Sequence, residues 1–400
     1  MYQLLEGLTI VEGAAFIAGP SCGLYLAQMG AQVIRFDQIG GGPDAKRWPL
    51  GPHGQSLYWE GLNKGKKSLA INLAAPEGRE LAQRVATSGD GLFVTNFPVN
   101  GFLSFEKLSA LRADLVSLRV MGWADGTPAV DYTINAAVGV PYITGHADDP
   151  RPVNHVLPAW DLLAGAYAAF ALLAAERERQ ASGKGRELRL ALSDLAAATM
   201  GNLGNVAEVL LSGEDRRKGG NNLFGAFGRD FATADGDRVM IVAITPKQWT
   251  GLIGALGLAQ AVAALESELG VDFASDEGAR YSHRARVDAL VEAALARRPL
   301  SACAEVFEAT GCTWSVYRNL SDALAKEPRL FGENPVFAPV THAGGDTYPT
   351  PGAPARLPGD ERAAPPPAPR IGEHTDEVLG SLLGMSGGEI GRLHDAGVVA

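Results

Sequence analysis

Residues 7–37 read GLTIVEGAAFIAGPSCGLYLAQMGAQVIRFD, and this stretch decides the fold class. Residues 8–11 are apolar and β-branched, as expected of a buried strand. Gly19 and Pro20 suit the start of a helix, and residues 33–36 form a second apolar run. A strand, a helix and a second strand in this order predict a parallel sheet.

The same alternation continues along the chain. We expect further helices over 76–85, 105–111, 160–179 and 194–211, and further strands over 91–95, 115–120 and 187–192. This order predicts an α/β protein with a large, open parallel-sheet domain of the Rossmann-like type.

The chain is expected to divide into three parts. Residues 1–211 form the large α/β domain, and a charged, Gly-rich linker over 213–220 follows it. A strand over 239–243 and helices over 247–256 and 279–296 predict a small α+β domain over 212–330. Residues 331–400 hold an extended Pro-rich connector over 349–369 and return the C-terminus to the large domain.

Composition limits the classes of function. A formal net charge of −10 argues against general nucleic-acid binding, which depends on clustered Lys and Arg. The apolar run over 162–175 is too short to span a bilayer and is expected to be a buried helix. Three scattered cysteines and an N-terminus without a basic start and apolar core predict a cytoplasmic protein.

The familiar cofactor and catalytic motifs are missing. The first turn, residues 12–20, lacks G-x-G-x-x-G, so a nicotinamide or flavin enzyme is disfavoured even though Asp37 ends the second strand. No metalloprotease, serine-elbow or phosphate-loop pattern occurs, and no metal site is expected. Carboxylate chemistry remains.

Two features could carry that chemistry, and each has a structural alternative. Lys46 and Arg47, with Lys64, Lys66 and Lys67, could bind phosphates, or they could be solvated surface residues. Asp161 precedes the most apolar helix and could be a reactive carboxylate or a helix N-cap.

Long stretches of the chain resemble the family III CoA transferases. The resemblance lies in residues 7–37, in NKGKKSLAINLAAPEGRELAQRVATSGDGLFVTNF over 63–97 and in PAWDLLAGAYAAFALLAAERERQASGKGRELRLALSD over 158–194. It implies that residues 1–211 bind CoA and that Asp161 carries the acyl group and then the CoA. It also implies an interlocked homodimer, with no cofactor beyond the CoA of the substrate.

The resemblance suggests which residues contact CoA. In the sequence these residues follow the first expected strands or belong to the basic runs. They are Phe16, Ile17, Ala18, Gln38, Lys46, Arg47, Lys64, Asn96 and Phe97. The chain departs from formyl-CoA transferases at Ile17, where they have Gln, and at Ser104, where the family has Arg. FGAFGRDF over 224–231 replaces their Gly-rich loop, so formyl or oxalyl transfer is disfavoured.

Residues 39–49, 61–68, 153–161 and 224–231 are most similar to members that move CoA between the two carboxylates of the unsaturated C5 acid mesaconate. The residues expected at this substrate are Asn154, His155, Phe224, Gly225 and Arg229. Transfer to a separate acid such as succinate is the main alternative. An acyl-CoA racemase is disfavoured because Val130 stands where its His is expected, and a non-catalytic binding subunit because Asp161 is intact.

The mechanism predicts a charged Asp161. At a helix N-terminus, exposed N–H groups and the helix dipole are expected to keep its carboxylate ionised, so that it attacks without a general base. Backbone N–H groups of the turn over 16–19, or those of Gly225 and Gly228, are candidate donors to the oxyanion.

Overall fold

The computed structural model describes residues 1–400, and the chain forms two compact units. The first comprises Met1–Val138, His155–Gly213 and Glu333–Ala400, and the second comprises Gly139–Asn154 and Glu214–Gly332. The expected division after 211 and near 330 lies close to these boundaries. Residues 139–154 differ, because they pack with the second unit although they lie between two parts of the first.

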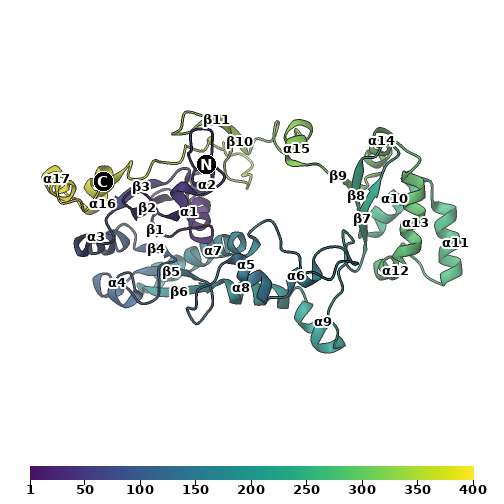
Figure 1. The fold of residues 1–400 in the computed structure, drawn as a ribbon, viewed down its shortest axis with the longest axis horizontal. Helices are drawn as coiled ribbons and strands as arrows, with labels where there is room; N and C mark the ends of the chain where they lie inside the picture. Colours follow the sequence, from purple (N-terminus) through teal and green to yellow (C-terminus); the bar gives the residue numbers. More distant parts are fainter. The chain divides into compact units, whose positions relative to one another are not determined.

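The first unit is built on a six-stranded sheet in which every pairing is parallel (Figure 1). Its order is β3-β2-β1-β4-β5-β6. The strands are β1 (Thr9–Gly13), β2 (Gln32–Gln38), β3 (Lys67–Ile71), β4 (Leu92–Thr95), β5 (Val116–Met121) and β6 (Arg186–Ala191). The expected open parallel sheet is therefore confirmed, and its order reverses between β1 and β4.

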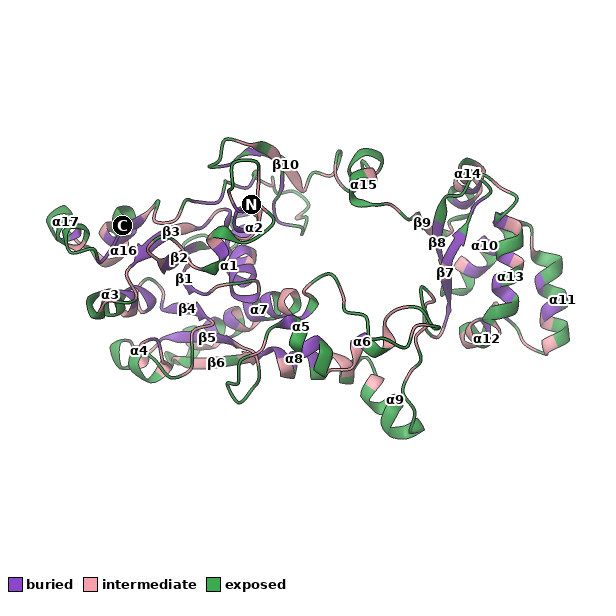
Figure 2. Ribbon diagram, viewed as in Figure 1, coloured by how far each residue is buried: buried purple, intermediate pink, exposed green.

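Helices cover this sheet. The helices of the first unit up to β6 are α1 (Ala18–Gln28), α2 (Leu57–Asn63), α3 (Pro76–Ala86), α4 (Phe105–Leu111), α5 (Asp131–Ala137) and α7 (Ala159–Ser182), with the 3-10 turn η1 (Pro43–Lys46). Leu81 of α3 and Leu108 of α4 share one apolar core with Val11 and Phe93 of the strands. Figure 2 shows the central strands as buried.

Beyond β6 the expected helix over 194–211 is two helices, α8 (Leu192–Asn202) and α9 (Asn205–Ser212). Gly204 separates them with a φ of 81°, a value that ends a helix and that glycine adopts without strain. The extended connector expected over 349–369 begins inside a hairpin, which consists of β10 (Phe337–Thr341) and β11 (Thr347–Pro351). The chain ends in α16 (Thr375–Leu383) and α17 (Gly387–Asp395), whose Leu379 and Ile390 join the core of the first unit.

The second unit is a small α+β structure, as the sequence predicts. A three-stranded antiparallel sheet in the order β7-β8-β9 consists of β7 (Phe227–Ala232), β8 (Arg238–Ala243) and β9 (Thr313–Val316). Its helices are α6 (Val140–Ile143), α10 (Pro246–Leu256), α11 (Ala259–Leu269), α12 (Glu277–Ser282), α13 (Arg284–Leu295), α14 (Leu300–Thr310) and α15 (Leu320–Lys326). Trp249, Phe273 and Phe307 lie in its core.

Helix α7 positions the candidate nucleophile. The apolar run over 162–175, expected to be too short to span a bilayer, lies within a longer helix of 24 residues. By length and composition alone α7 is the one helix long and apolar enough to cross a membrane, and it packs against α1 and β5 in the first unit. Gly165 allows the close approach to α1, because a Cβ there would lie 2.6 Å from the Ser21 Cβ and 3.0 Å from the Ala18 carbonyl oxygen. The starts of α1 and α7 are thereby held next to each other.

Candidate active site

The turn after β1 is fixed across the switch point of the sheet. Asn96, directly after β4, donates through Nδ2 to the Ala15 carbonyl at 2.9 Å and accepts from the Ala15 N–H at 3.1 Å. The side-chain amide thus uses both of its polar ends on one backbone residue. Asn96 holds the turn in place, and its expected contact with CoA stays a prediction.

Phe16 has an unusual backbone conformation. Its φ of 69° is the only positive φ at a residue other than glycine, a conformation that bulky side chains adopt at a cost of about 1–3 kcal/mol. Its N–H donates to the Asp44 carboxylate at 2.9 Å, so this N–H is occupied and is a poor candidate for the oxyanion. Such strain is typical of a functional turn.

Asp44 is anchored by a buried charge network. Arg35, 1% exposed, contacts Asp44 at 3.1 Å, Asp37 at 2.8 Å and Glu12 at 3.2 Å. Burial raises the pKa of Asp44, and the positive charge of Arg35 opposes that rise. The acid at the end of β2 therefore serves an internal ion pair, which agrees with the absence of a dinucleotide loop.

The basic residues do not form one phosphate-binding cluster. Lys66 is buried and contacts Glu12 at 2.9 Å, and Lys67 pairs with Glu377 at 2.6 Å. Lys64 is also buried, donates to the Gly61 carbonyl at 2.6 Å, and has its pKa lowered to about 8 by burial. Lys46 and Arg47 are exposed and Lys67 is half-exposed, so the joint patch is wrong for Lys66, which lies in a buried ion pair. The contacts of Lys46, Arg47 and Lys64 with CoA stay predictions.

Asp161 lies in the first turn of α7. The N-cap is Pro158, so the interpretation of Asp161 as an N-cap is wrong. The turn's donors go to another residue: Asp131 accepts through Oδ2 from the N–H of Trp160 at 2.7 Å and of Asp161 at 3.1 Å. The Asp161 carboxylate itself is half-buried and accepts no hydrogen bond from the protein.

The charge state of Asp161 differs from the expectation. Burial, and then the negative charge of Asp131, raise the pKa of Asp161 to about 6, while Arg47 opposes the rise. The helix terminus does not lower this pKa, because its N–H groups already serve a different carboxylate. Asp161 is still mainly ionised above pH 7.

Arg47 stands over two aromatic rings beside Asp161. Its guanidinium carbon lies 5.5 Å from the centre of the Phe16 ring and 5.2 Å from that of Tyr58. No carboxylate lies within ion-pair distance of it, so its donors remain available to an anionic ligand.

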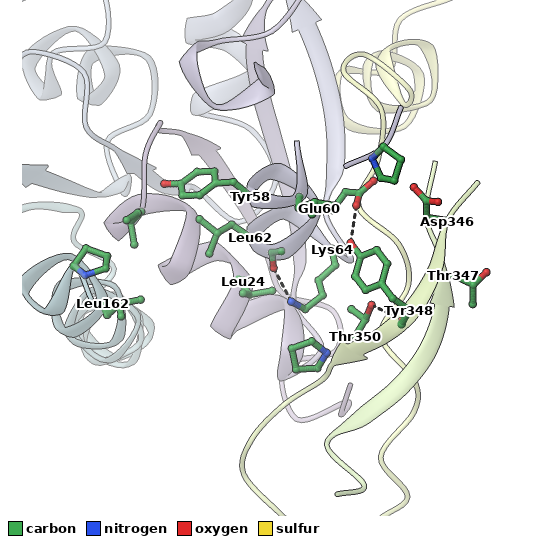
Figure 3. Close-up of a pocket in the computed structure, with 16 residues that line it drawn as sticks. Leu24, Tyr58, Glu60, Leu62, Lys64, Leu162, Asp346, Thr347, Tyr348 and Thr350 are labelled. Atoms are coloured by element: carbon green, nitrogen blue, oxygen red, sulfur yellow. Dashed lines mark hydrogen bonds between the residues drawn. The ribbon is translucent and has the colours of Figure 1, made fainter. Parts of the chain in front are cut away.

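A cavity of about 800 Å³ opens at this end of α7 (Figure 3). Ile17, Tyr58, Pro158 and Leu162 are among its walls, together with residues of α2, β11 and the turn before β11. The lining is mainly apolar, and Figure 3 shows Lys64 among the lining residues, with its Nζ hydrogen-bonded to the Gly61 carbonyl. Its size suits a small organic ligand.

The other expected CoA contacts have structural partners. Gln38 accepts through Oε1 from the Leu73 N–H at 2.8 Å, and the ring of Phe97 packs on those of Phe36 and Phe102 at 6.5 and 5.8 Å.

At the start of α1 the N–H groups of Ala18 and Gly19 precede the first intrahelical hydrogen bond, so they remain free to donate.

The expected substrate residues do not all lie in the same unit. His155 is in the first unit, and its Nε2 lies 2.8 Å from Asp131 Oδ1, so it contacts a buried carboxylate. Asn154, Phe224, Gly225 and Arg229 belong to the second unit. There Arg229 pairs with Asp288 at 3.3 Å, and the Arg216 guanidinium lies 3.6 Å from the Phe224 ring centre. Their contact with substrate stays a prediction.

Sequence reasoning missed Asp131 and Tyr58. Asp131 begins α5, and an acid in a first turn reads as an ordinary helix-start residue. Its actual partners lie 29 and 30 positions further along the chain, a spacing that no local pattern reveals. Tyr58 stands in the short helix α2, and its ring lies under Arg47, 11 positions earlier in the chain, a contact that no local pattern reveals.

The sheet order and the half-buried carboxylate beyond its switch point are features of an α/β enzyme that works on a ligand held at the carboxyl ends of the strands. The chain belongs to CoA-transferase family III, whose family model matches residues 5–375. The family indicated by the sequence is confirmed, and the protein is a CoA-transferase family enzyme.

Two curated relatives refine this result. The chain is 47% identical over 404 residues to the 2-methylfumaryl-CoA isomerase of Chloroflexus aurantiacus, covering 100% of this chain and 98% of that protein. It is 33% identical over 304 residues to succinyl-CoA–D-citramalate CoA-transferase of the same organism, covering 72% of each. A solved CAIB/BAIF family structure from Brucella suis has a TM-score of 0.76 at 23% identity, over 94% of this chain and 99% of that one, and supports the fold.

Proposed function

We propose that this enzyme isomerises 2-methylfumaryl-CoA by moving CoA from one carboxyl group of the acid to the other. The observation that carries this proposal is the 47% identity, along the full chain, to an enzyme with this activity. The acid that receives CoA is then the acid that gave it up, and no separate acceptor is needed.

The proposed first half of the reaction loads CoA onto Asp161. A carboxylate oxygen of Asp161 attacks the thioester carbonyl carbon, the C–S bond breaks, and CoA leaves as a thiolate. The product is a mixed anhydride between Asp161 and the acid. The thiolate then attacks the Asp161 Cγ, the bond from Cγ to the anhydride oxygen breaks, and the acid is released as a carboxylate beside an aspartyl-CoA thioester.

The second half runs the same steps with the other carboxylate. That group attacks the Asp161 Cγ and expels the thiolate, which then attacks the acyl carbon of the new anhydride and regenerates Asp161. The released acid must stay bound between the halves. Arg47 supports this, because a planar guanidinium with unpaired donors beside Asp161 can hold the carboxylate that is not reacting.

Each attack develops a negative oxygen. The N–H groups of Ala18 and Gly19 at the start of α1 are the donors that we assign to it, because the close packing of α1 on α7 brings this helix start near Asp161. Since Asp161 has a pKa of about 6, it is ionised at neutral pH and needs no general base.

We further propose a cytoplasmic homodimer that uses no cofactor beyond the CoA of its substrate. Support for the dimer comes from the exposed face of α7, where Leu163, Tyr167 and Phe170 are 40%, 49% and 65% exposed at helical spacing. Phe170→Glu is expected to shift the mass measured by light scattering from two chains to one. A mass unchanged by this substitution places the contact elsewhere.

The test of function is incubation with one regioisomer of 2-methylfumaryl-CoA, with and without isotopically labelled free acids, followed by chromatography of the CoA esters. Isomerisation without uptake of labelled 2-methylfumarate or succinate supports the proposal. Label in the product ester supports transfer to a separate acid. Asp161→Asn is expected to lower turnover by at least about 10³-fold, because the nucleophile is lost.

A further inference from the structure

Asp131 is an acidic residue placed beside the nucleophile without facing solvent. It is 1% exposed and begins α5. One of its oxygens accepts the N–H groups of Trp160 and Asp161, at 2.7 and 3.1 Å. The first turn of α7 is therefore capped by a carboxylate from a different helix, and the backbone of Asp161 is one of the capped groups.

His155 holds the other oxygen of Asp131. Its Nε2 lies 2.8 Å from Asp131 Oδ1, and its ring packs at 5.9 Å from Tyr132 and 6.3 Å from Trp160. Trp160 also donates through Nε1 to Asn135 Oδ1 at 3.1 Å. The start of α7 is thus tied to α5 through backbone and side-chain hydrogen bonds that are donated by Trp160 and by Asp161 itself.

This arrangement separates two effects of a helix start. The N–H groups that would stabilise an anion at Asp161 are used by Asp131, while the Asp131 charge stays close to the Asp161 carboxylate. A carboxylate without hydrogen bonds, near a second negative charge, is more basic and more nucleophilic than an N-cap aspartate.

We propose that Asp131 and His155 form a positioning pair that fixes the first turn of α7 and keeps the Asp161 carboxylate reactive by taking its hydrogen-bond donors. The inference rests on the proposed function in one respect, that Asp161 is the nucleophile. Neither Asp131 nor His155 exchanges a proton or a bond with the substrate.

The charges that face Asp161 come from three elements. Asp131 of α5 raises the pKa of Asp161, Arg47 after η1 lowers it, and Tyr58 of α2 interacts with both Asp161 and Arg47. Of these groups, only Asp131 both contacts the Asp161 backbone and carries negative charge. An isosteric neutral residue at position 131 therefore removes the negative charge while keeping an oxygen that can accept from the Asp161 backbone.

The experiment compares Asp131→Asn with the wild-type enzyme and with Asp276→Asn, which alters a similar cap of α12 in the second unit. The pH dependence of kcat/KM is measured for 2-methylfumaryl-CoA isomerisation. We expect the acidic limb of Asp131→Asn to move down by about one pH unit and its plateau to fall about tenfold. Asp276→Asn is expected to leave both unchanged.

A second readout needs no turnover. A carbodiimide that couples to protonated carboxyl groups is applied across pH, and modification of Asp161 is followed by mass spectrometry. The midpoint is expected to move to lower pH in Asp131→Asn. If the modification midpoint and the acidic limb of kcat/KM both stay at their wild-type pH values, the proposed role of the pair is refuted. A fall in activity or thermal stability alone does not rescue it, because loss of packing lowers rates without moving a titration.

The two proposals fail differently. If wild-type enzyme does not isomerise the ester, the proposed function fails, and the carbodiimide curve still tests the pair. If Asp131→Asn does not fold, His155→Phe and His155→Gln replace it. Gln retains a donor to Asp131 and is expected to keep at least ten times the activity of the Phe variant. Equal activity of the two overturns the role of His155.

Discussion

Replacing Asp161 by Asn removes a carboxyl group whose charged form is disfavoured by burial and by the charge of Asp131. Burial and Asp131 raise the pKa of this carboxyl from 3.8 to about 6. Between these pH values the native state keeps a proton that the unfolded chain has lost. The native state therefore binds more protons there, and stability falls as pH rises through this window.

The magnitude follows from the two pKa values. The difference between 3.8 and about 6, at about 1.4 kcal/mol per pH unit, gives about 3 kcal/mol of stability lost by pH 7. Asn resembles the protonated carboxyl and does not ionise. Asp161→Asn is thus expected to be more stable than wild type by up to about 3 kcal/mol at pH 7 and equally stable near pH 4, while turnover is abolished.

The assay is urea unfolding of both proteins at pH 4, 5, 6 and 7.5, with the midpoint and slope analysed together. Asp114→Asn is the matched control, because Arg112 lowers the pKa of Asp114 and its loss should destabilise the same unit at neutral pH. An Asp161→Asn variant whose gain is absent at pH 7.5, or is the same at pH 4, would refute this account of the site's electrostatics.

Three further predictions test the packing and charge around the site. Gly165→Ala places a Cβ 3.0 Å from the Ala18 carbonyl and should cost about 1–3 kcal/mol in unfolding free energy and lower kcat, whereas Gly201→Ala, with open space around it, should be neutral or stabilising. Arg47→Lys should raise KM about tenfold with an unchanged acidic limb, while Arg47→Met should also move that limb to higher pH, because Arg47 lowers the pKa of Asp161; equal profiles would contradict the carboxylate role. Phe16→Gly should be more stable than Phe16→Ala by about 1 kcal/mol in thermal unfolding, since glycine tolerates a φ of 69°; the reverse order would show that the turn relaxes.

The sheet and the position of the nucleophile could be predicted from sequence because their signals are local. The apolar run of β1 and the long apolar run of α7 can each be recognised from neighbouring residues alone. Once the start of α7 is predicted, the position of Asp161 at that start follows directly. The resemblance then supplied the role of Asp161.

Long-range electrostatics could not be predicted in this way. Lys66 belongs to a run that reads as solvated, yet it pairs with Glu12, 54 positions earlier. Likewise the donors at the start of α7 looked available to Asp161 until the contact from Asp131 was known. Both errors arise because a charge's partner is set by how helices and strands assemble, which a short sequence window does not contain.

The buried ion-pair network of Arg35, Lys66 and Glu12 also limits which substitutions this protein can accept. All three side chains are almost completely buried, so altering one alone leaves an uncompensated charge in the core, at a cost of about 3–5 kcal/mol. Because Arg35 also holds Asp44, which in turn holds Phe16, such a loss would be felt at the turn beside the nucleophile. Folded variants at these three positions should therefore carry compensating substitutions at more than one of them. A library that varies one position at a time should yield folded protein almost only with the original residue.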